Sequence, residues 1–188
     1  MGFLDTILGR KKLKEASTEN LFALSTAQVT LEMELGLRTG GKAAVTFKPL
    51  SAGDFARADE DLGDLLEVAA QSSGSTVSRH SDTYGFQWIV VEDPDLEDLV
   101  TTVHLITSEL QARGFGPQLL ASIFRFEGEG RPVYWIYAYK RGAFYPFVPK
   151  GGQERDNATE LELKAKLERE LPIEPDLSRW YGMFDAPV

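Results

Sequence analysis

The sequence predicts an α+β fold, with a largely antiparallel sheet and helices packed on a face of it. Segments of alternating or β-branched residues come in pairs joined by glycine-containing turns, which is typical of hairpins. Each pair is followed by a stretch with apolar residues at helical spacing. This order of strand, strand and helix occurs three times after a short first helix. Hairpins separated by helices favour an antiparallel sheet.

The first unit follows the short helix. The predicted elements are that helix, a half-buried strand, its returning strand and an acidic amphipathic helix, over residues 17–24, 28–37, 43–49 and 51–70. Apolar and polar side chains alternate over residues 28–37, which is the pattern of a strand with one buried face. Thr39-Gly40-Gly41-Lys42 indicates the hairpin turn between the two strands. The Ser-rich stretch 71–75 reads as a linker and marks a candidate subdomain boundary.

The second and third units follow the linker. Their predicted strands span residues 76–80, 86–92, 118–126 and 132–139. Asp93 and Pro94 are expected to open the helix between the two hairpins, as N-cap and first helical residue, and Gly114 to close it. Asp156 or Asn157 then starts the last helix.

The strand over residues 132–139 is apolar on both faces, so it is expected to lie centrally in the sheet. An extended aromatic segment follows at residues 144–149. The C-terminal tail, residues 172–188, contains Trp180, Tyr181 and Phe184 and is expected to dock on the domain. Residues 17–188 are therefore interpreted as a single domain.

Composition excludes several classes of function. The chain of 188 residues contains no cysteine, which rules out a disulfide scaffold, thiolate metal ligation and thiol catalysis. Its net charge of −9 argues against nucleic-acid binding, because phosphate contacts need clustered Lys and Arg. No apolar run approaches the ~20 residues of a membrane span. These features fit a cytoplasmic protein.

Residues 1–16 form a basic amphipathic segment that differs from the rest of the chain. Its candidates for contact with a membrane surface are Phe3, Leu4, Ile7, Leu8, Arg10, Lys11 and Lys12. One apolar turn with a basic flank gives only reversible attachment at the inner face of the membrane. The alternative, an N-terminal helix docked on the domain, remains open.

No motif indicates catalysis or a cofactor. His80 and His104 lack the helix-spaced His or Glu partners of a metal site. Ser51 and Ser122 lack the Gly-x-Ser-x-Gly setting of a nucleophile. We therefore expect no catalytic residue, no metal, no cofactor and no enzyme activity.

Several stretches resemble a known family, the actinobacterial PspA-associated protein PspAB. They are residues 1–10, 114–120, 139–147, 155–158 and 174–177, of which Tyr-Lys-Arg-Gly-Ala-Phe-Tyr-Pro-Phe at 139–147 is the most specific. The resemblance implies a cytoplasmic accessory of the phage-shock envelope-stress response, whose partner is a PspA-like membrane-remodelling coiled coil. It implies no known enzyme activity. The last two units also look loosely like secretion-chaperone and YbjN-like folds. That likeness makes a protein-segment binding module without a stress role the alternative function.

A partner-binding groove is one interpretation of the aromatic block and the cations that follow it. The candidate residues are Lys140, Arg141, Phe144, Tyr145, Phe147 and Arg155. Cations beside aromatic walls would receive an acidic or amphipathic segment of a partner. The alternative is that the aromatics are core residues and the cations are solvated. The sequence leaves the oligomeric state undecided.

Overall fold

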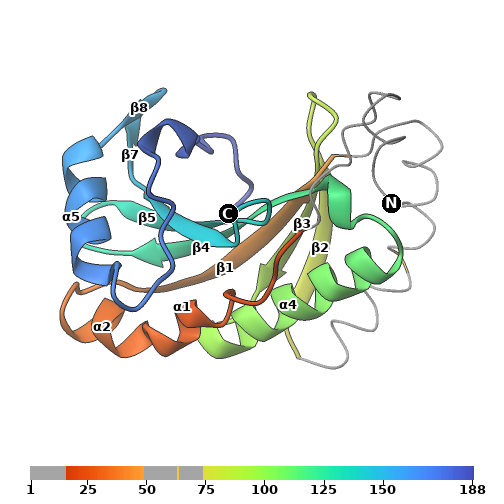
Figure 1. Cartoon of the computed structure of the whole chain (residues 1–188), viewed down its shortest axis with the longest axis horizontal. Coiled ribbons are helices and arrows are strands. Elements are labelled where there is room, and N and C mark those ends of the chain that lie inside the picture. Colours follow the sequence, from red (N-terminus) through yellow and green to blue (C-terminus); the bar gives the residue numbers. More distant parts are fainter. Residues whose placement is uncertain (1–15, 49–62, 64–73) are drawn as a thin grey trace, which may run out of the picture.

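The computed structural model describes residues 16–48, 63 and 74–188, and it confirms the predicted α+β fold (Figure 1). Six strands form one sheet in the order β2-β3-β1-β4-β5-β6, and all neighbouring pairs are antiparallel. The strands are β1 (Arg38–Phe47), β2 (Thr76–Ser81), β3 (Gln87–Glu92), β4 (Leu119–Glu127), β5 (Pro132–Ala138) and β6 (Ala143–Phe147). The helices are α1 (Ala23–Thr26), α2 (Gln28–Met33), α4 (Leu96–Ala112) and α5 (Asn157–Leu167).

The two faces of the sheet are covered in different ways. Helices α1, α2 and α4 lie along the first face, and the C-terminal tail crosses the second (Figure 1). Strand β5 contributes to both cores, as predicted: Trp135 and Tyr137 point to the helices, and Ile136 to the tail. A strand with apolar side chains on both faces is stable only when both faces are removed from water.

Helix α4 supplies the main cover of the first face. Its buried stripe repeats at helical spacing and consists of Leu96, Leu99, Val100, Val103, Ile106 and Leu110. The helix ends before Gly114, which has a φ of +89°, as expected of a glycine at this position. Its N-cap, however, is Asp95 rather than Asp93, because the Asp95 carboxylate accepts hydrogen bonds from the backbone of Glu97 and Asp98. Pro94 therefore lies before the helix and not at its first position.

The prediction of a strand over residues 28–37 is wrong. Residues 28–33 form helix α2, because tertiary packing buries Leu24, Ala27 and Leu31, which lie on one side of a helix, against the core under the sheet. The backbone bonds Ala27 N to Ala23 O and Leu31 N to Ala27 O, both 3.0 Å, make α1 and α2 almost continuous. The helix predicted over residues 17–24 begins later, at Ala23.

The predicted hairpin turn at residues 39–42 is also wrong. These residues belong to the single long strand β1, which has an irregularity in its pairing with β4 between Thr39 and Ala43. Gly41 adopts a φ of +69°, and a Cβ on Gly40 would lie 2.9 Å from Cγ of Arg125. Gly41 therefore allows the backbone conformation of a β-bulge, and Gly40 allows the close approach of Arg125. Neither glycine forms a hairpin turn.

The second and third units follow the sequence prediction closely. Strands β2 and β3 form the predicted hairpin, as do β4 and β5. The aromatic segment after β5 is strand β6, and a small hairpin of β7 (Pro149–Gly151) and β8 (Glu154–Arg155) leads into α5. Asp156 caps α5 by accepting from Thr159 N. The predicted helix over residues 51–70 and the residues proposed to touch a membrane lie outside the described residues.

The C-terminal tail docks on the domain, as expected. Phe144 N donates to Pro172 O and Glu174 N donates to Phe144 O, so the tail adds a short parallel bridge to the edge of β6. Beyond the short helix Leu177–Arg179, Trp180 stacks on Tyr145 with 6.0 Å between ring centroids. The tail is thus part of the fold.

Replacing Asp95 by alanine should lower the free energy of unfolding by about 1 kcal/mol, because the first turn of α4 loses its side-chain cap. Urea denaturation measures this change. Asp98→Ala is the matched control: it removes the same charge from the same turn without removing the cap, and should cost about 0.3 kcal/mol. Equal losses in the two variants would contradict the assignment of Asp95 as N-cap.

Candidate functional site

The aromatic residues predicted to bind a partner lie in the interior. Phe144 and Phe147 are at most 1% exposed, and Tyr145 is 2% exposed. Phe144 packs on Tyr137 in the first core, with 4.7 Å between ring centroids. Phe147 and Tyr145 belong to the second core, beneath the C-terminal tail. In this state of the protein, these three rings offer almost no surface to a partner.

Arg155 also has internal partners. Its guanidinium donates from Nε to both carboxylate oxygens of Glu160 at 2.9 Å, and from Nη1 to the carbonyl of Trp180. The Glu160 side chain is 2% exposed, and it also accepts from Val148 N at 2.9 Å. Arg155 therefore ties β8, α5 and the C-terminal tail together, and its guanidinium lies 5.2 Å from the ring centroid of Phe147.

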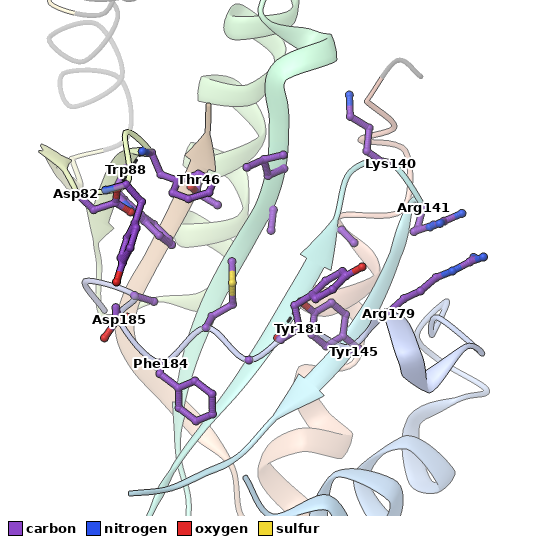
Figure 2. Close-up of a pocket in the computed structure, with 18 residues that line it drawn as sticks. Thr46, Asp82, Trp88, Lys140, Arg141, Tyr145, Arg179, Tyr181, Phe184 and Asp185 are labelled. Atoms are coloured by element: carbon purple, nitrogen blue, oxygen red, sulfur yellow. Dashed lines mark hydrogen bonds between the residues drawn. The ribbon is translucent and has the colours of Figure 1, made fainter. Parts of the chain in front are cut away.

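Lys140 and Arg141 lie at the surface, in the turn after β5. Lys140 Nζ donates to the carbonyl of Pro117 at 2.6 Å, and Arg141 Nε lies 3.7 Å from a carboxylate oxygen of Glu174. Arg179 reaches the same carboxylate at 3.8 Å. Figure 2 shows the ends of all three cationic side chains pointing away from the centre of the sheet face. These cations form a partly exposed rim. Together with Tyr145 they line one cavity, whereas Phe144 and Phe147 are not part of its lining.

An exposed stripe of three apolar side chains and one threonine runs along the outer side of α1 and α2. Its members are Phe22, Thr26, Val29 and Met33, which we call the outer stripe. Val29 is 72% exposed, Met33 81% and Phe22 41%. Their spacing of four, three and four residues places them within roughly 60° of one another around a helix. Large apolar side chains gathered in this way on a surface are typical of an interaction site.

The outer stripe has the spacing of a coiled-coil seam. Phe22, Thr26, Val29 and Met33 take successive d, a, d and a positions of a heptad. The opposite side of the same helical segment, Leu24, Ala27 and Leu31, is buried in the core. The helical segment therefore has apolar side chains on two sides. One side is buried in the core, and the other is exposed to solvent.

The outer stripe does not emerge from the sequence when residues 28–37 are given the period of a strand. With a period of two, Val29, Leu31 and Met33 share one buried face of a strand. With the helical period, Leu31 points inward and the other two point to solvent. The signal that was available is the spacing of Phe22, Val29 and Met33 in steps of seven and four, which a strand does not explain.

Two polar side chains, His104 and Asp82, have structural partners. His104 packs against Phe22 with 4.8 Å between ring centroids. Although partial burial alone would raise the pKa of Asp82, hydrogen bonds from the Trp88 indole and the backbone of Phe86 and Tyr84 hold it below its ordinary value. Among the described residues, no cluster of His, Asp and Glu has the arrangement of a metal site. Within the same residues, no helix is long and apolar enough to cross a membrane.

The second face of the sheet contains a cavity of about 500 Å³ beside the C-terminal tail (Figure 2). Its walls come from β1, β3, β4, β5 and β6 and from residues 179–186 of the tail. The lining is mostly apolar. A concave apolar site of this size is in the range of small-molecule sites.

Arg155→Ala should lower the free energy of unfolding by about 3 kcal/mol, because it leaves the buried Glu160 carboxylate without its cation. Arg141→Ala is the matched control, and it should cost less than about 1 kcal/mol, since the Arg141 side chain is 42% exposed and Glu174 keeps Arg179 nearby. Urea denaturation of both variants measures the difference. Similar small decreases in the free energy of unfolding of the two variants would show that Arg155 does not stabilise the fold through Glu160.

Comparison with known proteins identifies the family of this chain. The family model described as PspAB, PspA associated protein B, matches residues 1–188. Neither the curated proteins nor the solved structures include a significant match. The loose likeness to secretion-chaperone and YbjN-like folds is therefore not confirmed. Because the family model covers the whole sequence, the chain belongs to the PspA associated protein B family.

Proposed function

We propose that this protein is a non-enzymatic accessory of the envelope-stress response that binds a helix of a PspA-like coiled coil through the outer stripe. The observation that carries the proposal is the exposure of Phe22, Val29 and Met33 at heptad spacing. The family description, which names an association with PspA, supports the choice of partner. The partner presents one helix of its coiled coil alongside α1 and α2.

The physical basis of this contact is burial of the outer stripe. An isolated helix of this length is marginal in water, but here the buried residues Leu24 and Leu31 hold it on the domain. The stripe is therefore preorganised, and binding does not have to order it. A second helix packing its own a and d residues against Val29 and Met33 removes these side chains from water.

Charge around the outer stripe favours a particular register of the partner. Glu19 and Glu34 are exposed near the two ends of the stripe. Basic residues flanking the apolar seam of the partner helix would meet these carboxylates. Such rim charges set the partner choice and the association rate more than the affinity. The interface is short, about three helical turns, so we propose a reversible association rather than an obligate complex.

The cellular setting is part of the same proposal. The protein acts in the cytoplasm, and its basic segment 1–16 touches the inner face of the membrane reversibly. That contact would keep the outer stripe near a membrane-bound partner. The effect is an increase in local concentration and needs no further contact within the domain.

The double variant Val29→Asp/Met33→Asp should weaken binding to a purified PspA-like coiled-coil protein at least tenfold, because two charges enter the apolar seam. Isothermal titration calorimetry measures the dissociation constant. Leu161→Asp is the matched control: Leu161 is 46% exposed on α5, away from the outer stripe, and its variant should bind as the wild type does. Both changes place Asp in a helix, so their effects on folding should be similarly small.

Two results would overturn the proposal. One is unchanged binding by the Val29/Met33 variant with an intact fold. The other is loss of binding in Lys140→Ala/Arg141→Ala alone, which would place the interface on the cationic rim. Capture of many unrelated peptides by the wild type would favour a general segment-binding module instead.

A further inference from the structure

The cavity on the second face arises from a row of small side chains in direct register. Thr46 of β1 pairs with Ala121 of β4, which pairs with Ala138 of β5. Trp88 of β3 pairs with Thr46 on the other side and closes this end of the row. The adjacent row of the same face is filled by larger residues, namely Val90, Ile123, Ile136 and Tyr145 beside Ala44. The small side chains of Ala121 and Ala138 therefore leave a space above the sheet, whereas the larger side chains of the adjacent row fill the corresponding space.

The C-terminal tail forms one wall of this space but does not fill it. Met183 and Phe184 are only partly buried against the second core, and Phe184 packs edge-on against Phe147 at 5.0 Å between centroids. The row from Trp88 to Ala138 spans three strand spacings, or roughly 14 Å. The cavity is therefore elongated across the strands, with aromatic groups at both ends: Trp88 at one and Tyr145 with Tyr181 at the other (Figure 2).

One buried polar group in the cavity wall has no hydrogen-bond partner. The side chain of Thr46 is on the second face, the residue is 1% exposed, and its hydroxyl oxygen makes no hydrogen bond and has almost no accessible surface. A buried hydroxyl without a partner is unfavourable by about 1–3 kcal/mol, and native proteins rarely tolerate it. The β1 side chain two residues earlier on the same face is Ala44, so a hydroxyl is not a requirement of this surface.

The charged side chains around the cavity lie at its rim or are engaged by other groups of the protein. Lys140 Nζ donates to the carbonyl of Pro117, and Asp185 is exposed. At the Trp88 end, the Asp82 carboxylate already accepts from Trp88 Nε1 at 3.0 Å and from the backbone N–H groups of Tyr84 and Phe86 at 2.9 Å. At the other end, Arg141 and Arg179 share Glu174, and their guanidinium groups point outward (Figure 2). A charged head in the interior would therefore be desolvated without compensation.

We propose that this cavity binds a small neutral amphiphile: an alkyl or acyl chain that ends in an uncharged hydroxyl or carbonyl oxygen. The chain lies over Ala121 and Ala138 beside Met183, and its oxygen lies next to Trp88. A change of the Thr46 χ1 rotamer brings the hydroxyl to the cavity, where it exchanges a hydrogen bond with that oxygen. The site is distinct from the outer stripe, which lies on the helices that cover the opposite face of the sheet.

The test uses the full chain, without a partner protein, and three probes that share one alkyl chain: decanol, decanoate and decyltrimethylammonium. Methyl NMR spectra of alanine- and threonine-labelled protein locate binding. Decanol should shift the methyl signals of Thr46, Ala121 and Ala138 saturably. The two charged probes should bind at least tenfold more weakly. Absent shifts at these methyls, or equal binding of a charged probe, would overturn the proposal.

Variants separate the cavity from the rest of the fold. Ala138→Leu fills the cavity and should weaken decanol binding at least tenfold. Ala143→Leu, the same change at the paired position on β6 outside the cavity lining, should leave it unchanged. Thr46→Val keeps the shape of the side chain and should weaken binding roughly fivefold, the value of one hydrogen bond. It should also raise the urea midpoint. Unchanged affinity in Thr46→Val would remove the role of the hydroxyl and overturn the assignment.

Binding of decanol in the cavity does not depend on the proposed coiled-coil partner. The Val29→Asp/Met33→Asp variant should bind decanol as the wild type does, because its changes lie on the far side of the sheet. Loss of coiled-coil binding with intact decanol binding, or the reverse, shows which of the two proposals fails.

Discussion

A sheet that is apolar on both faces is the constraint on which the rest of this structure depends. Strand β5 places Trp135 and Tyr137 on one side and Ile136 on the other, all fully buried. The chain must therefore supply two covers. Helices α1, α2 and α4 form the first, and the C-terminal tail forms the second. The covers differ in kind, because a helix satisfies its own backbone whereas an extended tail depends on hydrogen bonds to its neighbours.

The two covers leave different surfaces behind. The helical cover uses one side of α1 and α2 and exposes Val29 and Met33 on the other, at the spacing of a coiled-coil seam. The tail cover is thinner than a helix and crosses a row of small side chains, so it leaves a cavity next to Thr46. The outer stripe and the cavity therefore both result from the way in which each face of the sheet is covered. They lie on opposite sides of the sheet.

Charged side chains hold the second cover in place. Arg155 joins Glu160 of α5 to the carbonyl of Trp180, and Glu174 gathers Arg141 and Arg179 at the start of the tail. A buried carboxylate such as that of Glu160 requires its cation, so the role of Arg155 is structural. The density of basic residues beside the aromatic block reflects the anchoring of the tail as well as any contact with another protein.

The sequence by itself determined the α+β class, the hairpins β2–β3 and β4–β5 and the two-faced strand β5, because these depend on local periodicity and turn residues. It also indicated the docked tail, because aromatic side chains such as Trp180 are unfavourable in water. Tertiary structure decided the rest. Residues 28–33 are helical because Leu31 completes a buried stripe with Leu24 and Ala27. The glycines at 40 and 41 belong to a bulge, because Arg125 lies against Gly40 and the carbonyl of Asp93 against Gly41. The outer stripe and the cavity around Thr46 depend on which side of each element is covered. That depends on contacts between residues far apart in the chain, which local patterns do not encode.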